Sequence, residues 1–115
     1  MENNDAVTAL AALAQSSRLA VFRSLVELGP EGANPSDLAQ TLDIPGNTLS
    51  FHLKTLAHAS LITAEQTGRF IRYRANFDEM RDLVDFLTRN CCGGDPGKCA
   101  PRPAAAQKAK SVRRG

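Results

Sequence analysis

The fold is decided by residues 46–62, which read GNTLSFHLKTLAHASLI. On a helical wheel of about 100° per residue, Leu49, Leu53 and Leu56 fall on one narrow face and predict a buried stripe. The opposite face carries small polar residues, one cation and one aromatic ring: Asn47, Ser50, Phe51, Lys54 and His58. This segment is therefore predicted to form an amphipathic helix that begins near Asn47 and ends near Ala59.

A second short helix is predicted just before it. Asn34 suits the N-cap, Pro35 suits the first helical position, and Asp37 places a negative charge in the first turn. The segment 43–46, Asp-Ile-Pro-Gly, ends this helix. Two short helices joined by a tight break predict a helix-turn-helix.

Two further helices are predicted upstream. The first runs from Ala6 to Ala14, and the second is capped by Ser16 or Ser17 and stops at Gly29-Pro30. Their apolar positions at helical spacing are Val7, Leu10, Ala11 and Ala14 in the first helix, and Leu19, Phe22 and Val26 in the second.

A β-hairpin and a last helix follow. Two β-prone runs, 61–66 and 70–74, flank the turn Thr67-Gly68-Arg69 and predict a wing. Asn76, with Glu79 three residues later, is typical of a helix start, and this helix is predicted to end near Asn90. Its apolar stripe comprises Met80, Leu83, Val84 and Leu87, and Cys91 continues the same spacing. The predicted fold class is mostly α with a β-hairpin wing, a winged helix-turn-helix.

Length and charge bound the interpretation. A chain of 115 residues predicts one domain, here residues 1–92, followed by a cysteine-containing loop and a basic, disordered tail over residues 93–115. Residues 1–92 hold eight basic and eleven acidic side chains, a net charge of −3, whereas residues 93–115 hold six and one, a net charge of +5. Any nucleic-acid surface on the folded part must therefore be a local patch. The acidic start Met-Glu-Asn-Asn-Asp shows no apolar signal core, so we expect a cytoplasmic protein that does not enter a membrane.

Such a patch is present in residues 46–75, which carry four basic side chains and one acidic one. Asn47 is suited to read an adenine edge, Phe51 to meet a thymine methyl group and Lys54 to hold a phosphate. Arg69 at the wing tip suits the minor groove, and Arg72 lies on a wing strand face with Arg74. The predicted DNA-binding residues are Asn47, Ser50, Phe51, Lys54, Arg69 and Arg72. The alternative is an ordinary solvated helix face, which the exposed aromatic ring of Phe51 disfavours. His52 lies beside the leucine stripe and is interpreted as a packed, hydrogen-bonded residue.

The helix-turn-helix resembles that of a known family. Residues 47–56, together with Ala59-Ser60-Leu61-Ile62 and the segment 16–22, are similar to signatures of the ArsR/SmtB repressors, and the resemblance covers about residues 5–92. It implies a homodimer joined through the first and last helices, which binds palindromic operator DNA and releases it on binding a metal or metalloid. Pro45-Gly46 stands where the family often has a serine-like cap. The family's Cys-x-Cys site would fall within residues 33–38, which contain no cysteine.

All three cysteines, Cys91, Cys92 and Cys99, follow the last predicted helix. Three soft sulfur donors are one short of a closed zinc site and favour a soft ion. Trivalent arsenic takes three thiolates in a pyramid, and antimony(III) shares that preference. The turn-forming residues 93–98 can fold Cys99 back over the adjacent pair, and Lys98 favours thiolates. The spacing also resembles that of arsenic-responsive members with a cysteine pair and a further cysteine after the last helix.

These observations predict a DNA-binding repressor that releases its operator when arsenite binds three thiolates. Two alternatives remain: a redox sensor in which Cys99 pairs with Cys91 or Cys92, and a repressor that responds to zinc or cadmium. A thiol enzyme is disfavoured because the chain shows neither a glycine-rich phosphate loop nor a base paired with a cysteine. A helix-turn-helix used for protein contact is a further alternative, and it predicts no salt-dependent DNA binding.

Overall fold

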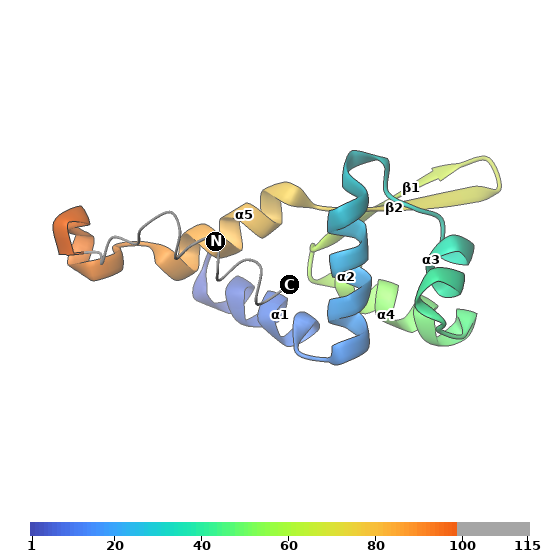
Figure 1. Cartoon of the computed structure of the whole chain (residues 1–115), viewed down its shortest axis with the longest axis horizontal. Helices are drawn as coiled ribbons and strands as arrows, with labels where there is room; N and C mark the ends of the chain where they lie inside the picture. The colour runs from blue at the N-terminus through green and yellow to red at the C-terminus, as the bar shows by residue number, and fades with distance from the viewer. Residues whose placement is uncertain (99–115) are drawn as a thin grey trace, which may run out of the picture.

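A computed structural model of the chain describes residues 1–98. A two-stranded antiparallel hairpin is set among five α-helices within these residues (Figure 1). The elements in chain order are α1 (Asn3–Leu13), α2 (Ser16–Leu28), the 3-10 turn η1 (Gly29–Glu31), α3 (Pro35–Leu42), α4 (Gly46–His58), β1 (Ile62–Thr67), β2 (Phe70–Ala75), α5 (Phe77–Thr88), and the 3-10 turns η2 (Cys91–Gly94) and η3 (Pro96–Lys98). This order confirms the predicted winged helix-turn-helix. None of the helices within residues 1–98 is long and apolar enough to cross a membrane.

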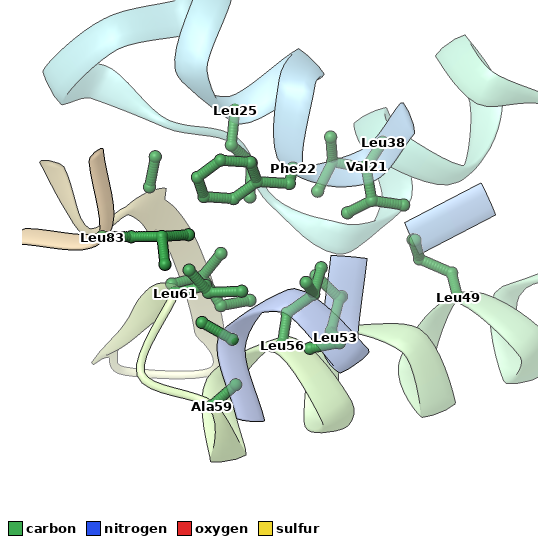
Figure 2. Close-up of a cluster of buried hydrophobic side chains, with 14 of the residues drawn as sticks. Val21, Phe22, Leu25, Leu38, Leu49, Leu53, Leu56, Ala59, Leu61 and Leu83 are labelled. Carbon is green, nitrogen blue, oxygen red and sulfur yellow. The ribbon is translucent and has the colours of Figure 1, made fainter. Parts of the chain in front are cut away.

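The core lies between α2 and α4, and side chains from every other helix and from the wing base complete it (Figure 2). The predicted stripe of Leu49, Leu53 and Leu56 is buried, and each of these residues is at most 1% exposed. From α2, the buried side chains are Val21, Phe22 and Leu25. Of the predicted apolar positions, Phe22 is buried and Val26 packs against the core, whereas Leu19 is 44% exposed. The leucines on the inner side of α4 therefore anchor this helix to the core, and its outer side stays exposed.

The first helix buries its small side chains and exposes the larger ones among its predicted apolar positions. Ala6, Ala9 and Ala12 are buried against the core, whereas Val7 and Leu10 are 55% and 43% exposed. The alanine face allows close packing of α1 on its neighbours, and this leaves the larger apolar side chains pointing outward. The helical spacing of Val7 and Leu10 therefore marks an exposed apolar side of α1, not its core side.

The junction between α1 and α2 also differs from the prediction. Gln15, not Ser16 or Ser17, caps α2, and its side-chain oxygen accepts a hydrogen bond from the Arg18 backbone N–H at 2.8 Å. The Arg18 guanidinium turns back and donates from Nε to the Ala12 carbonyl at 2.6 Å. A cation at the C-terminal end of a helix satisfies carbonyl groups that lack an intrahelical partner and also complements the helix dipole.

The predicted start and end of α3 are confirmed. The Asn34 side chain accepts a hydrogen bond from the Asp37 N–H at 2.8 Å, and Pro35 occupies the first turn. Asp43 ends the helix in a left-handed conformation, with φ 56° and ψ 49°. Pro45 then precedes α4, whose first residue is Gly46, one position earlier than predicted.

The last helix ends earlier than predicted. Helix α5 stops at Thr88, Arg89 is extended, and Asn90 is left-handed with φ 58°. Cys91 therefore lies in η2 and does not continue the apolar stripe of Val84 and Leu87, as the spacing alone had predicted. The side-chain stripe and the first cysteine are separated by a change in backbone direction.

Candidate DNA-binding surface and thiol site

Helix α4 presents the predicted polar face to solvent. Asn47, Ser50, Lys54 and His58 are exposed, and the ring of Phe51 is 63% exposed. The ring of Phe51 is therefore an apolar element on an otherwise polar helix face, and the core of the fold does not use it. Helix α4 is thus divided into a leucine face that holds the core and an outer face free to enter a groove.

Asn47 has a local hydrogen bond near the start of α4. Its Oδ1 accepts from the backbone N–H of Thr48 at 2.9 Å. Reading an adenine edge uses both the oxygen and the NH₂ group of an asparagine side chain. Asn47 keeps its NH₂ group and the second lone pair of Oδ1 for a base edge, although its hydrogen bond to Thr48 fixes how the side chain is oriented.

His52 lies on the inner side of α4 and is only 7% exposed. This confirms the interpretation of His52 as a packed residue. Its Nδ1, however, has no hydrogen-bond partner within the described residues, so the expected hydrogen bond is absent at that atom. The ring of His52 is tilted by 59° against that of Phe51, with the two centroids 6.1 Å apart.

The wing extends past the body as a ribbon of two strands (Figure 1). The register pairs Thr67 with Phe70 next to the turn and Ile62 with Ala75 at the base. Arg69 lies exposed at the tip, and Gly68 adopts the left-handed φ of 63° that the turn requires. The neighbouring Phe70 is 75% exposed. Phe70 was given no role in the sequence-based prediction, although an aromatic residue beside a turn was a visible signal.

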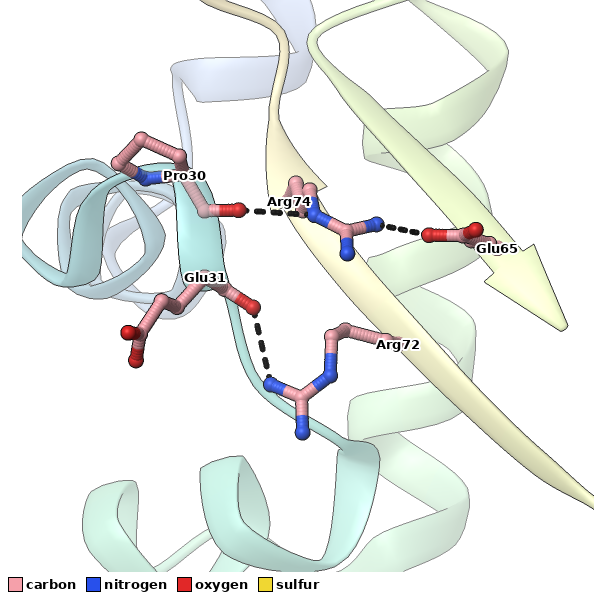
Figure 3. A network of polar contacts seen from close by, with 5 residues as sticks. All are labelled: Pro30, Glu31, Glu65, Arg72 and Arg74. Atoms are coloured by element: carbon pink, nitrogen blue, oxygen red, sulfur yellow. Dashed lines mark hydrogen bonds and ion pairs between the residues drawn. The ribbon is translucent and has the colours of Figure 1, made fainter. Parts of the chain in front are cut away.

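Arg72 and Arg74 lie at the other end of β2 and turn toward the segment that joins α2 to α3 (Figure 3). Arg72 Nη1 donates to the Glu31 carbonyl at 2.9 Å, and Arg74 Nε donates to the Pro30 carbonyl at 2.8 Å. Arg74 also forms an ion pair with Glu65 on β1, with Nη1 and Oε1 2.6 Å apart. Both arginines thus have protein partners that the sequence did not reveal.

Three cations of the predicted surface have no carboxylate partner within residues 1–98. Lys54, Arg69 and Arg72 form no ion pair there, whereas Arg74 is neutralised by Glu65. Unpaired cations on exposed elements are available to phosphate groups, and they release counterions when they bind. Of the four basic residues counted in the sequence, three therefore contribute a positive charge that is unpaired within the described part of the chain. These three lie on α4 and the wing.

The two described cysteines lie together just after α5. Cys91 and Cys92 are both exposed, and their sulfurs are 3.6 Å apart. Cys92 is left-handed, with φ 57° and ψ 36°, so the two neighbouring side chains do not alternate as they would in a strand. A disulfide would need about 2.05 Å between the sulfurs, whereas two sulfurs on one tetrahedral ion with bonds of about 2.3 Å stand roughly 3.8 Å apart. The two sulfurs are therefore in contact without a bond between them, and they are close enough for both to bind one ion.

The third predicted ligand, Cys99, and the tail predicted to be disordered both lie outside the described residues. Residues 1–98 contain no group of three or more candidate ligand side chains that could hold a metal ion. Neither His52 nor His58 joins the cysteine pair, because both belong to α4. The described part of the chain supplies two of the three predicted sulfurs.

An apolar surface covers the outer side of α1 and α5. Val84 and Leu87 on α5 are 56% and 57% exposed, and Val7 and Leu10 on α1 add to them. The two helices contact each other and lie together at the end of the molecule away from the wing (Figure 1). We refer to these four residues as the α1–α5 face.

Comparisons with known proteins agree with this geometry. A family model described as a helix-turn-helix domain matches residues 13–65. The arsenical resistance operon repressor of Bacillus subtilis (strain 168) is 33% identical over 81 residues, which cover 70% of this chain and 73% of that protein. An ArsR-like transcriptional regulator from Rhodococcus sp. RHA1 has a similar structure, with a TM-score of 0.68 and 22% identity over 96% of this chain and 92% of that one. The homodimeric winged helix-turn-helix DNA-binding domain of Mb0332 from Mycobacterium bovis matches with a TM-score of 0.62 and 20% identity, over 81% of this chain and 86% of that one.

Proposed function

Because the chain belongs to the ArsR family of winged-helix, DNA-binding transcriptional repressors, we propose that it releases its operator when trivalent arsenic binds Cys91, Cys92 and Cys99. The observation that carries the proposal is the pair of exposed sulfurs 3.6 Å apart directly after α5. The relative in Bacillus subtilis is a repressor of an arsenical resistance operon, which supports arsenic as the class of inducer.

DNA binding in this proposal uses the outer face of α4 and the wing tip. Helix α4 enters the major groove, where Asn47, Ser50 and Phe51 face base edges. Lys54 binds the phosphate backbone, and Arg69 enters the minor groove. Arg72 donates one hydrogen bond to Glu31 and keeps other N–H groups that can bind DNA. The exposed ring of Phe51 supports this assignment because contact with a thymine methyl would remove it from water.

The operator-binding unit is proposed to be a homodimer joined through the α1–α5 face. Four half-exposed apolar side chains on two adjacent helices are an uncommon surface for a monomer. A twofold axis through this face makes the contact self-complementary, and it carries two α4 helices toward a palindromic operator. The Mycobacterium bovis neighbour is homodimeric, which supports this arrangement.

The thiol chemistry follows from the ligand set. Arsenous acid exchanges its three hydroxyl groups for three thiols, and each exchange forms one As–S bond, breaks one As–O bond and releases one water. The sulfurs of Cys91 and Cys92 lie together, and Cys99 supplies the third As–S bond. Antimony(III) is accepted by the same donors.

Release of DNA needs only a modest coupling. Cys91 lies three residues beyond the end of α5, the helix that carries half of the α1–α5 face. A ligand that prefers one backbone path through η2 biases how the two α5 helices pack, and hence the spacing of the two α4 helices. About 1–3 kcal/mol, or roughly 5- to 150-fold in affinity, is typical of allosteric coupling, and operator DNA must weaken arsenite binding by the same factor.

The test is fluorescence anisotropy with labelled DNA from the chain's own promoter, titrated with arsenite, antimonite, zinc, cadmium and peroxide. Arsenite is expected to release the DNA from the native protein, while Cys91→Ser, Cys92→Ser and Cys99→Ser each keep it bound. Thr88→Ser changes a neighbour without removing a sulfur and should behave like the native chain. Release by peroxide that dithiothreitol reverses, with no effect of arsenite, would instead establish the redox alternative; release by zinc or cadmium alone would establish the metal-ion alternative.

A further inference from the structure

The wing contains few buried side chains that could fix its position on the body. In β1 only Ile62 is buried and in β2 only Ala75, and these two residues pair at the base of the hairpin. An isolated two-stranded ribbon is at best marginally stable in water. The contacts at the wing base must therefore determine where the tip lies.

Those contacts form a joint with the segment between α2 and α3. Ala33 and Tyr73 exchange two backbone hydrogen bonds, with N–O distances of 2.9 and 2.8 Å, and so pair as a single-residue strand. The guanidinium groups of the residues on either side of Tyr73 bind the two carbonyls of Pro30 and Glu31 (Figure 3). Four hydrogen bonds thus tie three consecutive residues of β2 to one short segment.

Gly32 lies at the centre of this joint and leaves no space for a side chain. A Cβ there would stand 2.0 Å from the Tyr73 carbonyl oxygen and 2.8 Å from Arg74 Cγ, and the φ of 63° is unfavourable for other residues. The close approach of the two backbones is therefore built into the sequence. Asn34, the N-cap of α3, follows Ala33 directly, so the joint connects the wing to the first residues of the helix-turn-helix.

Arg74 is the strongest side-chain contact in the joint. It bridges the Pro30 carbonyl on one side and Glu65 on β1 on the other, and its side chain is 33% exposed. Because Glu65 already neutralises its charge, Arg74 is expected to attract a phosphate group less strongly than Arg69, which has no ion pair within residues 1–98.

We propose that Arg74 is a positioning residue for DNA recognition: it holds the wing against the α2–α3 segment so that the tip reaches DNA together with α4. The proposal rests on the proposed DNA-binding function. From Arg74 to Arg69 the strand runs five residues, roughly 17 Å. A tilt of about 10° at the base moves the tip by about 3 Å, which is a hydrogen-bond length.

The discriminating variant is Arg74→Lys, which keeps the charge but cannot make both fork-like contacts. Operator affinity is expected to fall about three- to tenfold, whereas a phosphate contact made by charge alone would tolerate lysine. The matched control is Arg23→Lys, which changes an exposed ion pair with Glu27 on α2 and should leave affinity within about twofold.

A double-mutant cycle identifies the mechanism. Arg69→Gln alone is expected to weaken operator binding about tenfold, through loss of a charged contact at the tip. In the Arg74→Lys background the same change should cost at most about threefold, because the tip is no longer held at the DNA. A full tenfold cost in both backgrounds overturns the proposal.

A second measurement does not depend on DNA. In the free protein, Arg74→Lys should speed hydrogen exchange at the Ala33 and Tyr73 amides about fivefold or more, while the Leu56 amide in the core is unchanged. Equal hydrogen exchange at the Ala33 and Tyr73 amides in the native and variant proteins refutes the proposal that Arg74 holds the wing in place. If the native chain fails to bind its operator, the proposed function fails, and the exchange measurement still decides the role of Arg74.

Discussion

Replacing Leu87 by alanine tests the proposed dimer interface, because the exposed fraction of this side chain predicts how much the dimer should weaken. Full burial of a leucine side chain is worth about 1.5–3 kcal/mol relative to exposure. Since 57% of Leu87 is exposed, burial of that share in an interface contributes about 0.9–1.7 kcal/mol per copy. A twofold axis doubles every contact, so Leu87→Ala should weaken the dimer by about 2–3 kcal/mol, or about 30- to 150-fold in dissociation constant.

The assay is sedimentation equilibrium across a concentration series in the absence of DNA. The native chain is expected to be dimeric at micromolar concentration, and the variant should shift to monomer in the same range. Thermal unfolding at high protein concentration checks that the variant remains folded, because Leu87 is largely outside the core of one protomer.

Leu28→Ala is the matched control. Leu28 lies at the end of α2, away from the α1–α5 face, and is 50% exposed, so the lost side chain is of the same kind. Its dimer dissociation constant should stay within about twofold of the native value. An unchanged dissociation constant for Leu87→Ala, or a larger effect of Leu28→Ala, refutes the assignment of the interface.

Three further variants test the joint and the DNA surface. Gly32→Ala should lower the free energy of unfolding by about 2–3 kcal/mol, measured by urea denaturation, because its Cβ meets the Tyr73 carbonyl and its φ is positive; stability equal to the native protein contradicts the close approach. Lys54→Gln should reduce the slope of log affinity against log salt by about one while leaving base preference unchanged, and an unaltered slope means that Lys54 touches no phosphate. Phe51→Ala should weaken operator binding about tenfold in a competition assay with little change in thermal stability, because the ring is mostly exposed; a large loss of stability with normal DNA binding points to a packing role.

The parts of the fold that follow local rules could be predicted from the sequence. The leucine spacing in α4, the Asn34 cap and the Gly68 turn each depend on residues within a few positions of one another. Such signals are complete in the sequence because their partners are close along the chain. The helix-turn-helix and wing were therefore predicted with nearly correct boundaries.

The sequence left open what covers the apolar side of α1, for a different reason. Hydrophobic spacing identifies a side that avoids water, but it does not say whether a core or another protein covers that side. Val7 and Leu10 mark the outer surface, whereas small Ala9, fully buried, marks the inner one. The end of α5 was misplaced because Arg89 and Asn90 carry no strong stop signal, although the backbone turns there.

Within the candidate site, long-range partners were the missing information. Arg72 and Arg74 looked like a basic strand face, yet their acceptors are carbonyls 41 and 44 residues earlier in the chain. Every residue has a backbone carbonyl, so no sequence pattern indicates which carbonyl an arginine will bind. Phe70 was overlooked because the arginines that follow it on the strand were the residues considered for DNA, and its 75% exposure is visible only in the structure.

The arrangement of helices gives the proposed switch a physical route. Helix α5 packs on α1, and α1 in turn packs on α4 through the alanine face. Packed helices of this kind shift as bodies, since close packing between Ala9 and its neighbours leaves little room for independent adjustment. A change in η2 that tilts α5 is therefore transmitted through α1 to the leucine side of α4, and the outer side moves with it. The wing follows because its base is joined to the start of α3, so reading helix and wing tip change their position on DNA together. In this proposal, the thiol site beyond the last helix controls the DNA surface on the opposite part of the fold without contacting it.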